Sequence, residues 1–220
     1  MRSSRSLAWE FGKMGIYTLR VATHNDIDQV AGIHKQQFST HFLGKYSIDL
    51  LKQYYASFLG ESIFFVGEKS SQIDGFVLGG ESNKLQQAKN RFIKHNKYRC
   101  IMETLLMPEI YCQALSRIYS IISEVSGNYL NRSSDCSPNC AVGKRIRLLS
   151  IAVCQEAQGS GLATQLVQLF EQRIKLDNAA HGYGLSVKID NQRAIGFYKK
   201  IGFTLEGRKG KSIYFTKNIE

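Results

Sequence analysis

A glycine-bearing turn between a predicted strand and a predicted helix holds the residues best suited to chemistry. It reads Gln158-Gly159-Ser160-Gly161-Leu162-Ala163, and apolar residues at helical spacing follow it. The first N–H groups of a helix lack partners and carry partial positive charge, so such a turn can bind phosphate through its backbone. Glycines also permit backbone conformations that a Cβ forbids. The competing interpretation is a structural turn without a ligand.

Two common nucleotide-binding patterns do not fit this turn. The dinucleotide-binding pattern requires a third glycine where Thr164 stands, and an acidic residue at the end of the next strand. The P-loop requires a lysine directly after its second glycine, but Leu162 follows Gly161. The sequence therefore excludes both patterns.

The elements around the turn are predicted from their hydrophobic periods. A buried strand over residues 145–153 precedes it and a helix over residues 162–174 follows it. Leu185, Val187 and Ile189 alternate as a further strand, and residues 192–200 form a short helix that Gly202 ends. A final hairpin pairs two strands over residues 203–206 and 212–219.

The amino-terminal half supplies a strand over residues 16–22 and two helices. Thr23 and Asp26 resemble a capping box for the first helix, where His34 is predicted to be packed. Ser47 is predicted to cap the second helix, which carries Tyr55. Two strands over residues 62–67 and 73–79 form an antiparallel hairpin.

The order of these elements predicts a single α/β domain over residues 16–220, a mixed sheet with helices on its faces. Residues 83–140 break the rhythm and are predicted to be a helical insertion, beginning with a lysine-rich helix over residues 83–96. Residues 1–15 are predicted to be a flexible extension. They lack a continuous apolar segment and a cleavage site, and we expect a soluble, cytoplasmic protein without a membrane span.

Composition and charge limit the partners. The 220 residues are 43% hydrophobic, which excludes a disordered or collagen-like chain, and the net charge of +11 favours anionic ligands. No stripe of alternating aromatic and basic residues supports nucleic-acid binding. The five cysteines, which include Cys136 and Cys140, lack metal-site spacing, so we expect free thiols and no metal.

Two segments together resemble the GNAT superfamily of acetyltransferases. The superfamily motif [QR]-x-x-G-x-[GA] is matched by Gln158, Gly161 and Ala163 after a strand that ends Leu-Ser-Ile-Ala-Val. A second signature, an asparagine before a helix with A-I-x-F-Y and then G-F, is matched from Asn191 to Phe203. The resemblance implies the GNAT fold, with a mostly antiparallel sheet and helices on both faces. The insertion, with the segment 42–55, also resembles GNAT enzymes of surface-polysaccharide synthesis.

The resemblance implies an N-acetyltransferase that uses acetyl-CoA as co-substrate. The strand that ends at Val153 would splay from the next one and admit the pantetheine arm, and Tyr198 would protonate the departing thiolate. A phenol is a suitable acid for a thiolate. The cofactor-binding residues implied are Ile151, Ala152, Val153, Gln158, Gly159, Ser160, Gly161, Leu162, Ala163, Thr164, Asn191 and Tyr198.

The general base and the acceptor are left open. Arg147 and Ser186 stand where some GNAT enzymes carry a glutamate, so Glu81 at the end of a hairpin strand is the candidate base; it also fits a solvated strand end. A small primary amine, such as that of an amino-sugar nucleotide, is the expected acceptor. The alternatives are a protein or peptide amine, or a non-catalytic acyl-CoA-binding module, and a homodimer is one open arrangement.

Overall fold

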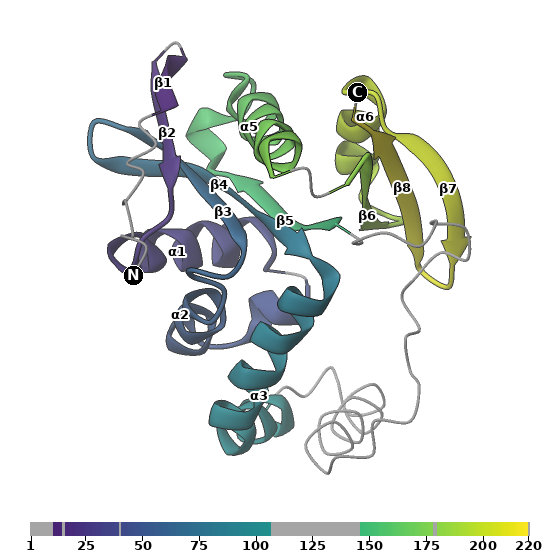
Figure 1. The fold of residues 1–220 in the computed structure, drawn as a ribbon. Coiled ribbons are helices and arrows are strands. Elements are labelled where there is room, and N and C mark those ends of the chain that lie inside the picture. The colour runs from purple at the N-terminus through teal and green to yellow at the C-terminus, as the bar shows by residue number, and fades with distance from the viewer. Residues whose placement is uncertain (1–10, 15, 40, 107–145, 178–179, 220) are drawn as a thin grey trace, which may run out of the picture.

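The computed structural model describes residues 11–14, 16–39, 41–106, 146–177 and 180–219, which Figure 1 shows. The strands are β1 (Phe11–Met14), β2 (Tyr17–Val21), β3 (Ile63–Lys69), β4 (Gln72–Glu81), β5 (Ile146–Val153), β6 (Gly182–Lys188), β7 (Thr204–Lys209) and β8 (Ser212–Asn218). The α-helices are α1 (Ile27–Gln37), α2 (Ile48–Ala56), α3 (Ser82–Leu105), α5 (Leu162–Leu176) and α6 (Gln192–Lys200). Short 3-10 helices are η1 (His24–Asp26), η2 (Leu43–Lys45) and η4 (Gln155–Ala157).

The strands form one mixed sheet in the order β1-β2-β3-β4-β5-β6-β8-β7, which confirms the predicted fold class. β5 and β6 run parallel, and the other neighbouring strands of the described sheet run antiparallel. The predicted extension over residues 1–15 is corrected at its carboxyl end, because Phe11–Met14 forms β1 on the edge of β2. The strand is formed by pairing with β2, which no local pattern indicates.

Helices cover both faces of the sheet. Tyr55 of α2 packs edge-on against Phe76 of β4, with ring centroids 5.2 Å apart. On the other face Leu162 of α5 lies over Gly67 and Gly75, where a Cβ on Gly67 would stand 2.5 Å from a Leu162 methyl group. Adjacent residues of a strand point to opposite faces, so glycine at 75 admits α5 while Phe76 meets α2. These glycines thus set how closely the start of α5 approaches the sheet.

β5 leaves β6 almost at once. Ile146 pairs with Tyr183 and Arg147 with Gly184, and the described strands form no further pair. On its other side β5 pairs with β4 as far as Val153, but the register shifts where Leu78 faces Ser150 and Gly79 faces Leu148. Leu149 is therefore the extra residue of a β-bulge, and a bulge bends and twists its strand. The bend follows directly on the last pair with β6 and accounts for the splay between the two strands.

Side chains join the two parts of the sheet behind the splay. Glu171 of α5 accepts a hydrogen bond of 2.7 Å from the Tyr183 hydroxyl of β6 and pairs with Lys217 of β8, also at 2.7 Å. The Lys217 ammonium lies 5.8 Å from the centre of the Phe203 ring. These contacts hold β6 and β8 to α5 where backbone pairing is short.

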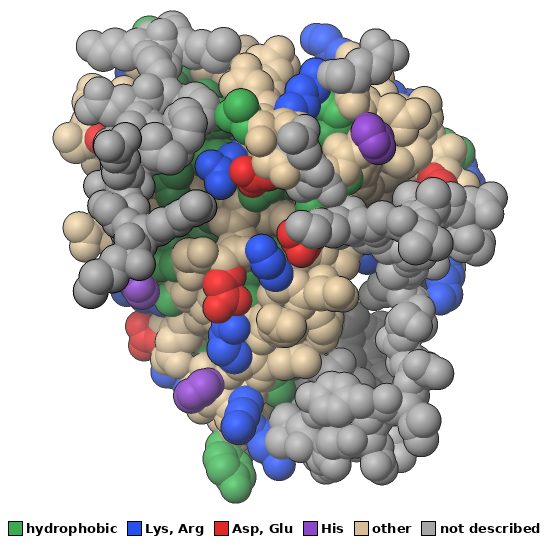
Figure 2. Space-filling model, viewed as in Figure 1, with side chains coloured by type: hydrophobic (Ala, Val, Ile, Leu, Met, Phe, Trp, Pro, Cys, Tyr) green, Lys and Arg blue, Asp and Glu red, His purple; other side chains and the backbone are tan. Residues whose placement is uncertain are grey.

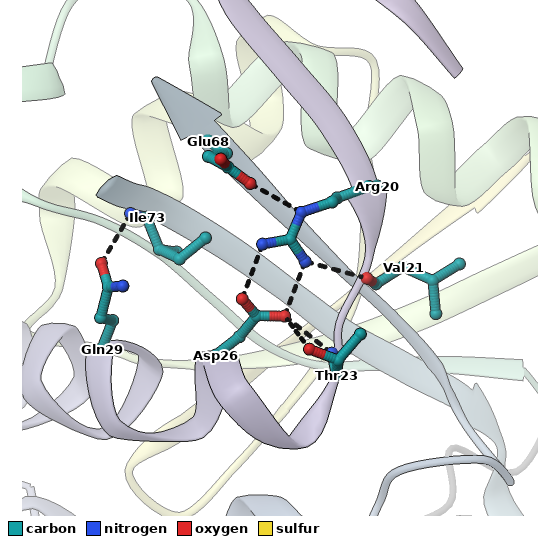
Figure 3. Close-up of polar contacts among 7 residues, drawn as sticks. All are labelled: Arg20, Val21, Thr23, Asp26, Gln29, Glu68 and Ile73. Atoms are coloured by element: carbon teal, nitrogen blue, oxygen red, sulfur yellow. Dashed lines mark hydrogen bonds and ion pairs between the residues drawn. The ribbon is translucent and has the colours of Figure 1, made fainter. Parts of the chain in front are cut away.

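An ion-pair network fixes the start of α1 (Figure 3). The Arg20 guanidinium of β2 donates to both carboxylate oxygens of Asp26 and to Glu68 of β3, each at 2.7 Å. Asp26 also accepts from the backbone N–H and the hydroxyl of Thr23, which confirms the predicted capping box. These bonds and the charge of Arg20 hold the pKa of Asp26 below its usual value, although burial opposes them. The network anchors the helix that carries His34 and Gln37.

The first helix of the predicted insertion is longer than expected. α3 begins at Ser82 and continues past Asn96 to Leu105. Asn96 has non-helical dihedral angles, φ −114° and ψ 18°, so the residue predicted to end the helix marks a kink. The rest of the predicted insertion, residues 107–140, lies outside the described residues, as do Cys112, Cys136 and Cys140. Cys100 and Cys154 are buried free thiols, as predicted.

Candidate active site

The start of α5 has amide groups that the protein leaves open. Gly161 is the N-cap residue, with φ +87°, and no side chain caps the helix there. The Leu162 N–H donates to Ser160 Oγ at 3.3 Å, whereas the N–H groups of Gly159, Gly161, Ala163 and Thr164 find no acceptor within the described residues. Gly159 and Gly161 both have positive φ with open space at the Cβ position. Bare amides, a helix dipole and space make a suitable site for a diphosphate.

Buried contacts and side-chain hydrogen bonds hold the conformation of this turn. Leu162 is fully buried against the sheet, and the Ser160 hydroxyl donates to the Ala157 carbonyl at 2.7 Å. The Gln158 amide donates to the Gln37 side chain at the end of α1, at 3.0 Å. The motif glutamine thus tethers the turn to α1. Whether it also touches a ligand stays a prediction.

The free edge of β5 lies immediately before the turn. Ile151, Ala152 and Val153 pair with β4 and lie beyond the last pair with β6. Ala152 is buried, whereas Ile151 and Val153 are half-buried. The edge of β5 that faces away from β4 can therefore pair with an extended chain, as an added strand does. The structure thus brings this edge and the bare amides together, and their use in binding a co-substrate stays a prediction.

Asn191 and Tyr198 lie on the other side of the splay, at α6. The Asn191 side-chain oxygen accepts from the Ala194 N–H at 3.0 Å and caps the helix. Tyr198 is only 6% exposed and packs against Phe203 and Phe215. Burial raises the pKa of Tyr198 above its usual value, so its hydroxyl keeps its proton at neutral pH. No described residue hydrogen-bonds that hydroxyl, which is therefore free to donate.

Glu81 ends β4 opposite Ile146 and directly precedes α3. Its carboxylate lies 3.7 Å from the Lys84 ammonium, and the side chain is partly exposed. The position is thus next to the paired start of β5 and not next to its free edge. Its predicted role as the general base stays untested, and the ion pair also fits the alternative of a solvated strand end.

Three polar side chains that lie far apart in the sequence are joined by hydrogen bonds in the structure, which the sequence did not predict. His34 of α1 and Tyr55 of α2 are hydrogen-bonded at 2.5 Å between Nδ1 and Oη, and Tyr55 Oη lies 3.5 Å from Ser150 Oγ of β5. His34 was predicted to be packed, and the structure confirms its burial. No sequence spacing could pair Tyr55 with Ser150, because 95 residues separate them.

Charges at the end of β6 act on the segment between α1 and α2. Burial lowers the pKa of His41 in that segment, the charge of Lys188 lowers it further and that of Asp190 raises it. Lys188 ends β6 and Asp190 lies in the turn before α6. The His41 imidazole therefore responds to the charges of the β6–α6 turn.

Charge on the visible face is spread rather than concentrated. In Figure 2 lysine and arginine side chains lie over α3 and around the sheet, with acidic side chains among them. No group of His, Cys, Asp or Glu side chains that could hold a metal occurs within the described ranges. Nor does any helix of those ranges have the length and apolar character for crossing a bilayer.

The chain is similar to one protein family and to several solved structures. The acetyltransferase (GNAT) family matches residues 121–203. SsHAT has a TM-score of 0.66 and 16% identity, covering 94% of this chain and 100% of that one. An N-acetyltransferase from Staphylococcus aureus Mu50 has a TM-score of 0.56 and 14% identity, covering 94% of this chain and 100% of that one. PaiA N-acetyltransferase from Thermoplasma acidophilum, solved with coenzyme A, has a TM-score of 0.52 and 12% identity, covering 92% of this chain and 98% of that one. No curated protein matches. These structures show that the fold is the GNAT fold.

Proposed function

We propose that this chain, an acyltransferase with the GNAT fold, transfers the acetyl group of acetyl-CoA directly to a primary amine of a small acceptor. The observation that carries the proposal is the junction of the free β5 edge with the open amides of α5. One feature offers backbone groups to an extended arm, and the other offers donors to a diphosphate. Acetyl-CoA has both groups in that order.

Several residues would act on the bound co-substrate, which supplies the acetyl group as a reactive thioester. The open N–H groups of Gly159, Gly161, Ala163 and Thr164 would hold the diphosphate, with glycine allowing close approach. The backbone of Ile151 and Val153 would bind the pantetheine arm. Tyr198 would protonate the thiolate as it leaves, and its raised pKa keeps the proton available.

Asn191 has two functions in this proposal. Its side-chain oxygen accepts from the Ala194 N–H, and its side-chain nitrogen is the donor that would meet the co-substrate. The cap also fixes the first turn of the helix that carries Tyr198. Structural and ligand-binding functions of Asn191 are therefore compatible.

For the acceptor we propose an amino-sugar nucleotide as the first compound to test. The net charge of +11 attracts a phosphate-bearing acceptor. The polysaccharide-type resemblance of the insertion supports the same choice, although residues 107–140 lie outside the described ranges. Glu81 is the base that the sequence proposes for removing the amine proton.

The test is a transfer assay with labelled acetyl-CoA and a panel of amines. The panel contains amino-sugar nucleotides, their sugar phosphates, simple polyamines and peptides with free amino termini. We expect label on a small amine, and on an amino-sugar nucleotide before the others. Label on peptides alone would replace the small acceptor with a protein one. Binding of acetyl-CoA without transfer to any amine would favour a non-catalytic binding module.

A further inference from the structure

A line of polar side chains runs from α1 through α2 to β5. The two contacts are His34 Nδ1 to Tyr55 Oη, 2.5 Å, and Tyr55 Oη to Ser150 Oγ, 3.5 Å. Ser150 lies beyond Arg147, the last β5 residue paired with β6, so it belongs to the splayed part of the strand. It directly precedes Ile151, where the co-substrate is proposed to bind. The line therefore ends beside the place of reaction.

His34 and Tyr55, two members of the line, are deeply buried. His34 is 5% exposed and Tyr55 is fully buried among apolar side chains. His34 Nε2 is buried and has no hydrogen-bond partner among the described residues. A buried polar atom without a partner costs about 1 to 3 kcal/mol, which an apolar side chain would avoid. A histidine at this position therefore stabilises the fold less than an apolar side chain would, and we infer that it has a chemical function.

The neutral form of the His34 ring is favoured. Burial lowers its pKa to about 4, and the charges of His41 and Lys35 act in the same direction, so the ring holds an added proton only in passing and gives it up readily. The groups that face it are Tyr55 from α2, Phe38 and Lys35 from its own helix region, and His41 from the following segment. Among these groups no carboxylate faces the ring, so the imidazole is neutral at pH 7 and one ring nitrogen is an acceptor.

We propose that Ser150, Tyr55 and His34, in place of Glu81, form a relay that removes the proton from the acceptor nitrogen. The inference rests on the proposed function. Ser150 Oγ accepts the nitrogen's proton and passes its own to Tyr55, and Tyr55 passes its own to His34 Nδ1. This direction uses the tautomer of His34 with its proton on Nε2. Ser150 touches the substrate, whereas Tyr55 and His34 act through it.

With the relay, every bond and proton of the acetyl transfer is accounted for. The acceptor nitrogen forms a bond to the acetyl carbon, the carbon–sulfur bond breaks, and its electron pair stays on sulfur. Tyr198 gives a proton to sulfur, and the relay takes one proton from nitrogen. Once the product has left, His34 Nδ1 returns the proton through Tyr55 and Ser150 to solvent, which restores its first tautomer. Tyr198 regains a proton from solvent, so the enzyme returns to its first state without any further reactant.

The first test compares two neighbouring tyrosines of α2 with an amine that the unchanged protein acetylates. Tyr55→Phe removes the middle hydroxyl of the line and should lower kcat about 100-fold, the lower end for a proton-transfer group, with the KM for acetyl-CoA unchanged. Tyr54→Phe is the matched control, because Tyr54 loses the same atom but its hydroxyl makes no hydrogen bond to the line. The Tyr54 ring packs edge-on against Tyr55 as well as against Phe58 and Phe92, so this variant also reports any effect of altered packing. It should keep kcat within about twofold.

The second test uses Ser150. Ser150→Ala should lower kcat as much as Tyr55→Phe, and Ser150→Thr should restore it, because threonine keeps the hydroxyl and suits a strand. The double variant Ser150→Ala with Tyr55→Phe should be no slower than either single one, because one missing link already interrupts a relay. A merely structural role would give additive losses and no rescue by threonine.

Three results would overturn the relay: equal losses in Tyr54→Phe and Tyr55→Phe, additive losses in the double variant, or loss of kcat in Glu81→Gln with Tyr55→Phe unaffected. Thermal unfolding of each variant checks that it is folded. If the unchanged protein binds acetyl-CoA but acetylates no amine, the proposed function fails and the relay with it. If the unchanged protein turns over and Tyr55→Phe does so equally fast, the relay alone fails.

Discussion

Two helices border the splay between β5 and β6, and their first turns are built differently. α6 is capped by its own Asn191, whose side-chain oxygen accepts from Ala194 at 3.0 Å. α5 begins at Gly161, which has no side chain to cap the helix, and only the Leu162 N–H of its first turn meets a side chain, Ser160 Oγ at 3.3 Å. α2 resembles α6, because Ser47 accepts from the Leu50 N–H at 3.3 Å. α1 and α3 also lack a side-chain cap, so α5 is distinguished by the open space beside its two glycines.

The difference has an energetic cost. A side-chain cap typically contributes about 1 kcal/mol, and α5 forgoes it. Gly161 adds the larger backbone entropy of glycine in the unfolded chain. A ligand that binds the α5 amides in the folded state would offset both through its binding free energy. We therefore propose that the start of α5 binds the ligand, whereas the Asn191 cap makes the start of α6 rigid.

The largest expected effect is on kcat and concerns Tyr198, which α6 carries. Tyr198→Phe keeps the ring packed against Phe203 and Phe215 and removes the proton donor. We expect kcat to fall about 100-fold while the affinity for acetyl-CoA stays the same. Steady-state kinetics with an accepted amine and calorimetric titration measure the two quantities. Unchanged turnover would remove Tyr198 from the mechanism.

The second effect concerns the open turn of α5. Gly161→Asp places a carboxylate where a diphosphate is proposed to bind, and Gly161→Asn is its uncharged match with the same strain at positive φ. We expect the aspartate variant to bind acetyl-CoA at least about tenfold more weakly than the asparagine variant, because like charges repel in a partly desolvated site. Calorimetric titration of both variants measures the difference. Equal affinities would show that no ligand charge lies at this turn.

The third effect compares the two capped helices. Asn191→Ala and Ser47→Ala each remove a cap, and each should lower the free energy of unfolding by about 1 kcal/mol. The loss at Ser47 should be the larger, since its hydroxyl also donates to Glu103 at 2.6 Å. We expect Asn191→Ala alone to weaken acetyl-CoA binding, by about threefold, or about 0.6 kcal/mol. If both variants bind alike, Asn191 is a cap and nothing more. Chemical denaturation and titration provide the measurements.

Features set by neighbours in sequence could be predicted from the sequence. The bounds of α6, Gln192–Lys200, were predicted correctly, and the caps at Ser47 and Thr23 are confirmed. Each depends on a helical period and on a polar side chain within three residues of its partner. The turn at residues 158–163 was recognised for the same reason.

Features that join distant segments could not be derived from local patterns. The bulge at Leu149 depends on how β5 meets β4, and β1 depends on the edge of β2. The hydrogen bonds of Tyr55 join side chains of separate helices and of β5, which no period reveals. The continuation of α3 past Asn96 reflects packing by the second half of that helix, for example buried Cys100, over a locally unfavourable residue.

The central claim, that the start of α5 binds the diphosphate of acetyl-CoA, is tested most directly by following backbone amide resonances during titration with coenzyme A. We expect the largest shifts at Gly159, Gly161, Ala163 and Thr164, with smaller ones at Ile151 and Val153. The first turn of α2, which Ser47 caps, should not move. Binding that shifts other amides and leaves Gly161 and Ala163 unchanged would contradict the claim.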